Sequence, residues 1–447
     1  MSTVEHTILD PNKLQSVAKD ILREAARRGA HQAEVSIAAN KGFTVSAHDG
    51  DVETVEYHQD KVIDITVYFG KRSGSASLSD IRSEAICAGV EAACHIAKFT
   101  DEDPDAGLAE KEELALHYPT LDLAYPWHIS VEKAIELTCE CEREALAYDK
   151  RIMRAEAAKM ATAEGWHVYA NSHDFIGLFP YTRHEIHCIL VAKEGEEMQR
   201  DYSYTTATDP AQLDSISHIA KSAAERTVQR LGARRLPTMK TPVIFVAEEA
   251  RGLLGHFITA IQGGALYRKS SFLVDHLNKK IFPSFVHIQE HPHLSKGLGS
   301  APFDDEGVVT RANVFVENGI LRNYCLGVYS ARKLGMKTTG NSGGVHNLTI
   351  QTGEKDFATL LKTMDKGLLI TEMMGHGVNM VTGNYSRGAS GFWVEHGEIQ
   401  YPVHEITVAG KLQDMYARIQ EVGNDVDRRG NIRTGSIFIE EMMVAGE

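Results

Sequence analysis

The sequence predicts an α+β fold with two N-terminal modules, each made of helices and an antiparallel sheet, and a larger, β-rich and glycine-rich C-terminal domain. Three observations support this prediction. Before residue 100, a helical pattern, several strand patterns and a second helical pattern follow one another, without the repeated strand–helix–strand units of a parallel sheet. A looser version of the same order lies between residues 125 and 232. Beyond residue 242 the chain is rich in glycine and in short strand-and-turn segments.

The first helix is predicted to start after Asp10, with Pro11 in its first position, and to end at Gly29. Aspartate accepts hydrogen bonds from the free N–H groups of a helix start, proline fits the first position, and glycine ends helices. Apolar residues at helical spacing fill the interval between these signals, so one face of this helix is expected to be buried.

Alternating apolar residues predict the sheet of the first module, and a second apolar stripe predicts a helix that packs on it. The expected strands span residues 33–39, 52–57 and 62–69, with a polar turn at 58–60, and the helix starts at residue 79 or 80. A strongly acidic connection then runs from residue 101 to about 125, and we interpret it as a solvated linker.

The second module is predicted to repeat this arrangement more loosely. Asp209 and Pro210 form the same start signal as before, and they predict a last helix that runs to Gly232. The other expected elements are a helix at 130–148 and strands around 166–170, 175–178, 185–192 and 202–206.

A third domain is predicted to open with a strand at 243–246 that leads directly into a helix. The acidic pair Glu248 and Glu249 suits the start of that helix, because the helix dipole favours negative charge there. The predicted domains are residues 1–120, 121–235 and 236–447.

Composition excludes several classes of protein. The chain has 447 residues and a formal net charge of −14. Nucleic-acid binding and docking on an anionic membrane both need a surplus of Lys and Arg, so this charge argues against both. The N-terminus lacks the features of a secretory signal, and no stretch is apolar enough for a membrane span. Six sparse cysteines suit reduced thiols, and we expect a cytoplasmic protein.

Histidines suggest two places for a metal ion, each with a plainer explanation. The predicted helix after residue 246 carries His256 alone, whereas a zinc peptidase helix carries two histidines and a glutamate. Exposed or hydrogen-bonded loop histidines are the preferred explanation of the densest cluster, which consists of His287, Glu290, His291 and His293.

Three further patterns involve polar residues near glycines. Glu372 and His376 stand four residues apart, and a hydrogen bond between them that fixes one turn is the preferred interpretation. The run at 340–344 (GNSGG) predicts a tight turn rather than an anion site. Tyr385 and Arg387 lie between glycines, which let a backbone approach another strand or a bound peptide closely. None of these patterns by itself indicates a reaction.

Six longer segments add a different kind of information. They are residues 267–273 (YRKSSFL), 290–294 (EHPHL), 329–335 (YSARKLG), 383–389 (GNYSRGA), 397–403 (GEIQYPV) and 422–425 (VGND). Together they resemble the TldD/PmbA family, and most closely its PmbA branch, which is also called TldE. The similarity covers nearly the whole chain in order.

The resemblance implies a cytosolic bacterial proteolytic system of two paralogous subunits, TldD and TldE, that is similar to a zinc metallopeptidase acting on small and unfolded polypeptides. The TldD branch carries a His-Glu-x-x-x-His motif and a further Cys ligand near its C-terminus. At the corresponding place this sequence has Gly255, His256 and Ala260, and its tail after residue 436 contains no Cys. Glycine and alanine side chains cannot bind zinc, so the resemblance implies the subunit without the metal.

We therefore expect a PmbA/TldE-like subunit with no cofactor of its own, and zinc in a TldD-type partner. The expected partner is that paralogue in a heterodimer, with a homodimer as the alternative when this chain is alone. Peptides are the expected ligands, whereas nucleic acid and membranes are not. The predicted substrate-groove residues are Tyr385, Arg387, His256 and His376, where an extended peptide would add to a strand edge.

Two alternatives stay open at this point. The first is a binding or scaffold protein of the gyrase-modulator type, the family's older label, which works independently of proteolysis. The second is autonomous hydrolysis at a metal site made of His287, Glu290, His291 and His293.

Overall fold

A computed structural model describes residues 10–446. Its first helix begins where Asp10 and Pro11 predict it. Helix α1 (Pro11–Arg27) begins after Asp10, whose side chain accepts a 2.9 Å hydrogen bond from the Asn12 N–H. Gly29 follows the helix with φ +88°, a conformation that glycine adopts without strain. The first module continues with β1 (Gln32–His48), β2 (Asp51–Phe69), β3 (Arg72–Leu78) and α2 (Ser83–Phe99).

Strand β2 shows that the predicted turn at residues 58–60 is wrong. The strand runs without interruption from Asp51 to Phe69, and Gln59 pairs with Lys41 of β1 in an antiparallel ladder. The polar side chains in the middle of β2 stay partly or fully exposed, while the backbone completes its hydrogen bonds with β1. A strand that faces solvent needs no apolar alternation, so the pattern could not reveal its full length.

The second module contains longer strands than predicted and a later final helix. Its elements are α3 (Val131–Ala147), β4 (Ile152–Asn171), β5 (Phe175–Glu194), β6 (Glu197–Ala207) and α4 (Ile216–Gln229). The runs at 175–178 and 185–192 are therefore parts of one strand. Asp209 and Pro210 start only a single 3₁₀ turn (Pro210–Gln212), and α4 is capped by Ser215, whose hydroxyl accepts from the His218 N–H at 3.2 Å.

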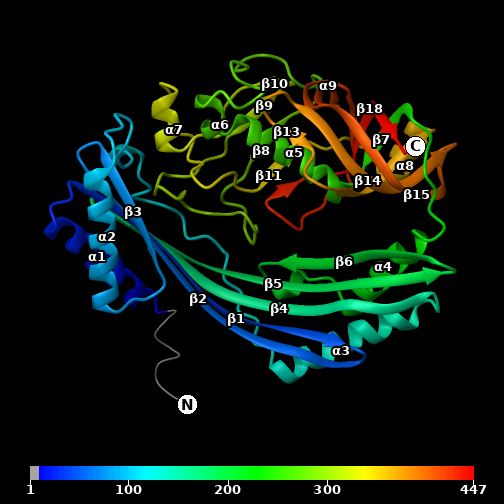
Figure 1. The fold of residues 1–447 in the computed structure, drawn as a ribbon, viewed down its shortest axis with the longest axis horizontal. Helices are drawn as coiled ribbons and strands as arrows, with labels where there is room; N and C mark the ends of the chain where they lie inside the picture. Colours follow the sequence, from blue (N-terminus) through cyan, green and yellow to red (C-terminus); the bar gives the residue numbers. More distant parts are fainter. Residues whose placement is uncertain (1–9, 447) are drawn as a thin grey trace.

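The two N-terminal modules share one six-stranded antiparallel sheet in the order β3-β2-β1-β4-β5-β6 (Figure 1). Strands β1 and β4 join them through a ladder that runs from Glu34 opposite Asn171 to Ala47 opposite Ala158. Helices α1 and α2 pack on one end of the sheet through a core that includes Val35. Helices α3 and α4 pack on the other end through a core that includes Val45, on the same face. The division at residue 120 stays a prediction.

The C-terminal part contains a barrel. It opens with β7 (Met239–Phe245), which leads into α5 (Ala247–Ile261) as predicted. The elements that follow are α6 (Gly263–Tyr267), β8 (Ile288–Glu290), β9 (Val314–Glu317), β10 (Ile320–Leu321), α7 (Val328–Lys333), β11 (Leu348–Ile350), α8 (Phe357–Met364), β12 (Gly367–Met374), β13 (Val378–Asn379), β14 (Asn384–Glu395), β15 (Glu398–Lys411), α9 (Leu412–Ala417), β16 (Ile419–Val422), β17 (Ile432–Arg433) and β18 (Ile437–Ala445). Strand pairing closes a ring in the order β12-β7-β18-β15-β14 and back to β12.

Glycine 391 explains how β12 and β14 approach closely enough to close this ring. A Cβ atom at Gly391 would lie 1.9 Å from the Leu369 carbonyl oxygen of β12. The absence of a side chain at Gly391 therefore allows the two strands to come close to each other. The α+β prediction with a β-rich C-terminal domain is confirmed, and pairing between distant strands decides that this domain is a barrel.

The C-terminal part lies over the face of the large sheet that is opposite to its helices (Figure 1). Phe303 anchors this contact, with its ring centroid 5.5 Å from that of Phe175 and 5.4 Å from that of Phe179 on β5. Tyr169 of β4 belongs to the same buried cluster. No helix within residues 10–446 is long and apolar enough to cross a membrane.

Candidate peptide groove

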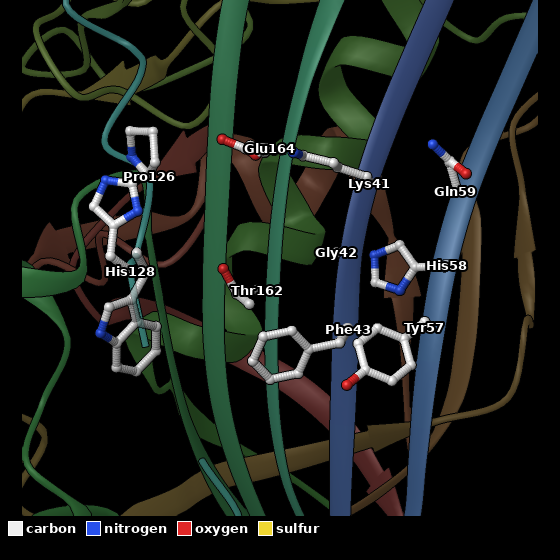
Figure 2. A pocket seen from close by; sticks show the side chains of 11 residues that line it. Lys41, Gly42, Phe43, Tyr57, His58, Gln59, Pro126, His128, Thr162 and Glu164 are labelled. Atoms are coloured by element: carbon white, nitrogen blue, oxygen red, sulfur yellow. Dashed lines mark ion pairs between the residues drawn. The ribbon is translucent and has the colours of Figure 1, made fainter. Parts of the chain in front are cut away.

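Three concave regions are candidates for a functional site. The first, of about 550 Å³, lies on the large sheet between the two pairs of helices (Figure 2). Phe43 and Tyr57 lie side by side there with ring centroids 6.2 Å apart. Lys41 and Glu164, which face each other across β1 and β4, form a 3.0 Å ion pair. Because these two charges satisfy each other, this region is a weak candidate for a polar ligand.

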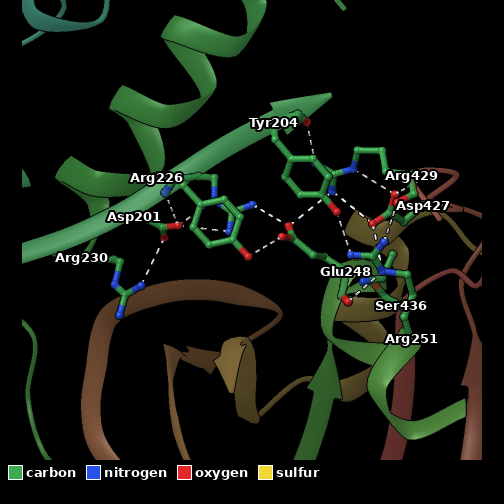
Figure 3. A network of polar contacts seen from close by, with 11 residues as sticks. Asp201, Tyr204, Arg226, Arg230, Glu248, Arg251, Asp427, Arg429 and Ser436 are labelled. Carbon is green, nitrogen blue, oxygen red and sulfur yellow. Dashed lines mark hydrogen bonds and ion pairs between the residues drawn. The ribbon is translucent and has the colours of Figure 1, made fainter. Parts of the chain in front are cut away.

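The second region, of about 590 Å³, lies where β6 and α4 meet the start of α5. A network of charged side chains forms its wall (Figure 3). Arg226 of α4 donates to Glu248 at 2.9 Å and to Asp201 of β6 at 3.2 Å. Arg429 donates to Glu248 at 3.3 Å and to Asp427 at 2.9 Å. These contacts connect the second module with the C-terminal part.

The arginines of this network lower the pKa values of Glu248 and Asp427 and so favour their ionised forms. Burial acts to raise the pKa of Glu248, but the charges of Arg226 and Arg429 outweigh it and hold that pKa below its usual range. The pKa of Asp427 is likewise lowered, because Arg429 outweighs the effect of burial. Every charge of this set has a partner, so the network serves to position α5 rather than to bind a ligand.

The third region lies along the exposed face of α5 and includes a hollow of about 330 Å³. Gly252, Gly255, His256 and Thr259 occupy this face at helical spacing. A Cβ at Gly252 would meet no atom within 4 Å, and one at Gly255 would meet only Ile432 at 4.0 Å. The helix thus leaves open space over Gly252, about one turn before His256.

His256, Tyr385 and Arg387 gather beside this face, where Tyr385 is buried in the core and Arg387 is half-exposed. The rings of His256 and Tyr385 meet edge to face with centroids 6.0 Å apart. Tyr385 and Arg387 are two positions apart on β14, so their side chains point to the same side of the strand. Arg387 donates from Nε to the Gly375 carbonyl at 3.0 Å, and it also contacts the Tyr385 side chain.

Burial and the Arg387 charge set the protonation states of the cluster. Burial first, and Arg387 second, lower the pKa of His256, which favours its neutral ring. Burial raises the pKa of Tyr385 to about 12, so its hydroxyl keeps its proton. Burial and the neighbouring Glu248 raise the pKa of Glu249 to about 7. The Nε2 atom of His256 is buried and has no hydrogen-bond partner.

Three of the four predicted groove residues are thus brought together. The fourth, His376, is exposed and lies next to Gly375, whose carbonyl accepts from Arg387. Glu249 belongs to the site and was not predicted for it, although its place at a helix start was noted. Only the tertiary approach of β14 to α5 reveals that Glu249 faces the same groove.

The predicted hydrogen bond between Glu372 and His376 is wrong, whereas the histidines of the cluster are exposed or hydrogen-bonded loop residues, as expected. No hydrogen bond joins Glu372 to His376 in the described chain; Glu372 lies in β12 and accepts one from Arg230. In the histidine cluster, Glu290 is fully buried and accepts from Asn341 Nδ2 at 2.9 Å and from the His346 N–H at 2.8 Å.

The metal-site alternative fails for the same cluster. Within residues 10–446 no group of three His, Cys, Asp or Glu side chains is arranged to hold a metal ion. His293 faces the Thr310 hydroxyl at 3.0 Å, and the N–H of Asn318 faces His287 Nδ1 at 3.5 Å. The hypothesis of autonomous hydrolysis at a metal site formed by this cluster is therefore wrong.

Sequence comparisons identify relatives of all three parts of the chain. Residues 33–97 match domain 1 of the PmbA/TldA metallopeptidases, residues 124–231 match their central domain, and residues 238–446 match their C-terminal domain. A "Metalloprotease PmbA" of Escherichia coli is 46% identical over 435 residues, which cover 97% of each chain.

Solved structures share the fold over nearly the whole length. A candidate modulator of DNA gyrase from Bacteroides thetaiotaomicron superimposes with a TM-score of 0.92 at 24% identity, over 98% of this chain and 100% of that one. TldE from Thermococcus kodakarensis superimposes with a TM-score of 0.83 at 20% identity, over 96% of this chain and 100% of that one. At these identities the likeness shows a common fold.

Proposed function

The chain belongs to the PmbA/TldA metallopeptidase family, and on that premise we propose that it is the PmbA/TldE-type subunit of a cytosolic zinc-dependent peptidase. In this proposal it works with a TldD-type partner on small or unfolded polypeptides. The partner supplies the zinc and the catalytic residues, and this chain supplies the groove along α5.

The residues on α5 carry the proposal. Gly255 and Ala260, which stand at the histidine positions of the TldD-branch motif, have no atom that can donate electrons to a metal. His256 stands at the position of the glutamate that acts as general base. The residues present on this helix therefore do not fit a zinc ion, and no step of hydrolysis is assigned to this chain.

The α5 groove supports a role in holding the substrate. Strand β14 is paired on both sides at Tyr385, with Val378 of β13 and Gly410 of β15, so a peptide would be held here by side chains rather than at a free strand edge. The open space beside Gly252 offers room for a ligand. Arg387 of β14 is half-exposed and its charge acts on Glu249 and His256 of α5, whereas Tyr385 is buried.

The test compares this chain alone, a TldD-type chain alone and the two co-expressed. Mass measurement gives the composition of the complex, metal analysis gives zinc per subunit, and a labelled unfolded peptide reports hydrolysis. We expect one zinc per heterodimer, and hydrolysis that is sensitive to a chelator only when both chains are present. The control is a complex whose partner has its motif glutamate replaced by glutamine, which should assemble but not cleave.

Stoichiometric zinc and chelator-sensitive hydrolysis in this chain alone would contradict the proposal. The scaffold alternative rests on the family's older label of gyrase modulator, because likeness to a solved structure at 24% identity shows the fold alone. Affinity purification of this chain from a bacterial lysate distinguishes the two. Recovery of gyrase without any TldD-type protein would favour the scaffold role, whereas a TldD-type protein in equal amounts supports the peptidase subunit.

A further inference from the structure

The Arg387 side chain is distinctive because its charge lacks a counter-ion. Within residues 10–446 no carboxylate forms an ion pair with it, and its guanidinium donates to the neutral Gly375 carbonyl. The guanidinium is half-buried, so its lost hydration is only partly replaced. An arginine carries five N–H donors in a planar fork, and most of them stay available for a ligand here.

The groups around Arg387 compensate its charge only in part. Burial and Glu248 raise the pKa of Glu249 on α5 to about 7, although Arg387 acts to lower it, so this carboxyl is only partly ionised near neutral pH. Glu248 and Glu372 are already engaged, the first with Arg226 and the second with Arg230. Arg387 therefore keeps part of its charge uncompensated, although the whole chain carries a net charge of −14.

Two neutral groups complete the surroundings. Tyr385 presents a protonated hydroxyl next to the guanidinium. His256 has a buried ring nitrogen, Nε2, that has no hydrogen-bond partner within the described chain. A neutral imidazole can donate from one ring nitrogen, and a hydroxyl donates as well. A cation with two neighbouring donors is an arrangement that binds a carboxylate, and Arg387 is its half-exposed member, because Tyr385 is only 2% exposed.

We propose that Arg387, Tyr385 and His256 form a subsite that binds a carboxylate of the peptide ligand. Arg387, the half-exposed member, provides the charge and a two-pronged hydrogen bond, with the Tyr385 hydroxyl and the buried His256 ring next to it. The carboxylate belongs either to the C-terminus of the peptide or to an Asp or Glu side chain. The inference rests on the proposed function in one respect, namely that the ligand is a peptide.

The experiment measures binding of four matched peptides to this chain by calorimetry. They are an apolar peptide with a free C-terminal carboxylate, its C-terminal amide, the amide with one internal Glu, and the amide with Gln at that position. We expect the plain amide and the Gln peptide to bind about tenfold or more weakly than the best carboxylate peptide, since a hydrogen bond to a charged group has that effect. Whether the free acid or the Glu peptide binds better identifies the source.

The variant Arg387→Gln should lose this discrimination, so that all four peptides bind within about twofold of each other. Arg387→Lys keeps a charge but not the fork, and should discriminate to an intermediate degree. Tyr385→Phe keeps the ring and should weaken only the carboxylate peptides. Arg82→Gln is the matched control, because Arg82 is exposed, pairs only with Asp80 and lies on the first module.

Several results would overturn the subsite. They are equal binding of all four peptides to the wild-type chain, an equal loss for all four in Arg387→Gln, and no binding of any of them. The same peptides tested on the complex separate this inference from the proposed function. Cleavage of all four peptides at equal rates would contradict the carboxylate subsite but not the peptidase role. Zinc-dependent cleavage by this chain alone would contradict its role as the subunit without zinc but not the binding result.

Discussion

The Tyr202 hydroxyl on β6 donates a 2.8 Å hydrogen bond to the Glu248 carboxylate in the first turn of α5. This contact joins residues 46 positions apart and fixes the start of α5 against the edge of the large sheet. The guanidinium of Arg226 lies over the Tyr202 ring at 5.3 Å, so one aromatic side chain holds both members of the ion pair. Because this junction fixes the start of α5, it also fixes the position of the groove along that helix.

Replacing Glu248 is expected to destabilise the protein strongly. Glu248→Gln leaves Arg226 and Arg429 without their common carboxylate in a site where the Glu248 side chain is only 7% exposed. Breaking a buried ion pair by removing one partner costs about 3 kcal/mol or more. Tyr202→Phe, which removes one hydrogen bond, should cost about 1 kcal/mol. Urea denaturation of both variants checks the difference, and equal losses would contradict the role assigned to the charge.

Stability is expected to fall with rising pH because of Glu306. Burial raises the pKa of this carboxyl from 4.5 to about 7, so the folded state holds a proton that the unfolded state releases. The free energy of unfolding therefore decreases as pH rises through this window, and the penalty is complete above pH 7. Glu306→Gln should remove the penalty and stabilise the protein at pH 8 by on the order of 2 kcal/mol, with little effect at pH 4.

Thermal melting between pH 4 and pH 9 measures this effect. The exposed Glu398→Gln serves as the control and should follow the wild-type profile. A Glu306→Gln profile parallel to that of the wild type would show that Glu306 stays ionised in the folded protein.

Two helix glycines should respond to alanine in opposite ways. At Gly252 in α5 a Cβ meets no atom within 4 Å, so Gly252→Ala should stabilise by up to about 1 kcal/mol through helix propensity. At Gly89 in α2 a Cβ would lie 2.6 Å from Leu78 Cδ2, so Gly89→Ala must displace the Leu78 side chain. We expect Gly89→Ala to melt below Gly252→Ala; the reverse order would contradict the packing between α2 and β3.

Phe303 is expected to hold the C-terminal part against the large sheet. Its side chain is 1% exposed and contacts Tyr118, Phe175 and Phe179. Phe303→Ala should cost about 3–5 kcal/mol, as large deletions in a core do. The exposed Phe99→Ala should cost less than about 0.5 kcal/mol. Limited proteolysis and melting temperatures of both variants provide the comparison. A Phe303→Ala variant with the melting temperature and protease resistance of the wild type would show that Phe303 does not hold the two parts together.

Local signals predicted those parts of the fold whose causes are local. Asp10, Pro11 and Gly29 act within a few residues of α1, and the structure confirms the helix between them. The same signal misled at Asp209, because a cap and a proline can also close a single 3₁₀ turn. The length of β2 was missed since its exposed middle is held by hydrogen bonds to β1, a partner that no local pattern names.

The candidate site follows the same division. Glycines around Tyr385 and Arg387 singled out β14, and the family motifs pointed to the same strand, so the residues could be named from the sequence. His376 was also named; it lies exposed just after β12, and Glu372 in that strand pairs with Arg230 instead. Glu249 was missed as a groove residue, since its partner in the site is 138 positions away.

The sequence by itself determined the α+β class, the capped first helix, the strand that enters α5, and the absence of zinc-binding side chains at positions 255 and 260. These properties depend on residue chemistry and on neighbours within a few positions. Only the tertiary structure decided that two modules share one sheet, that five distant strands close a barrel, and that His256, Tyr385 and Arg387 meet. Each of these outcomes depends on hydrogen bonds or packing between residues far apart in the chain, and such contacts form only when the whole fold brings their partners together.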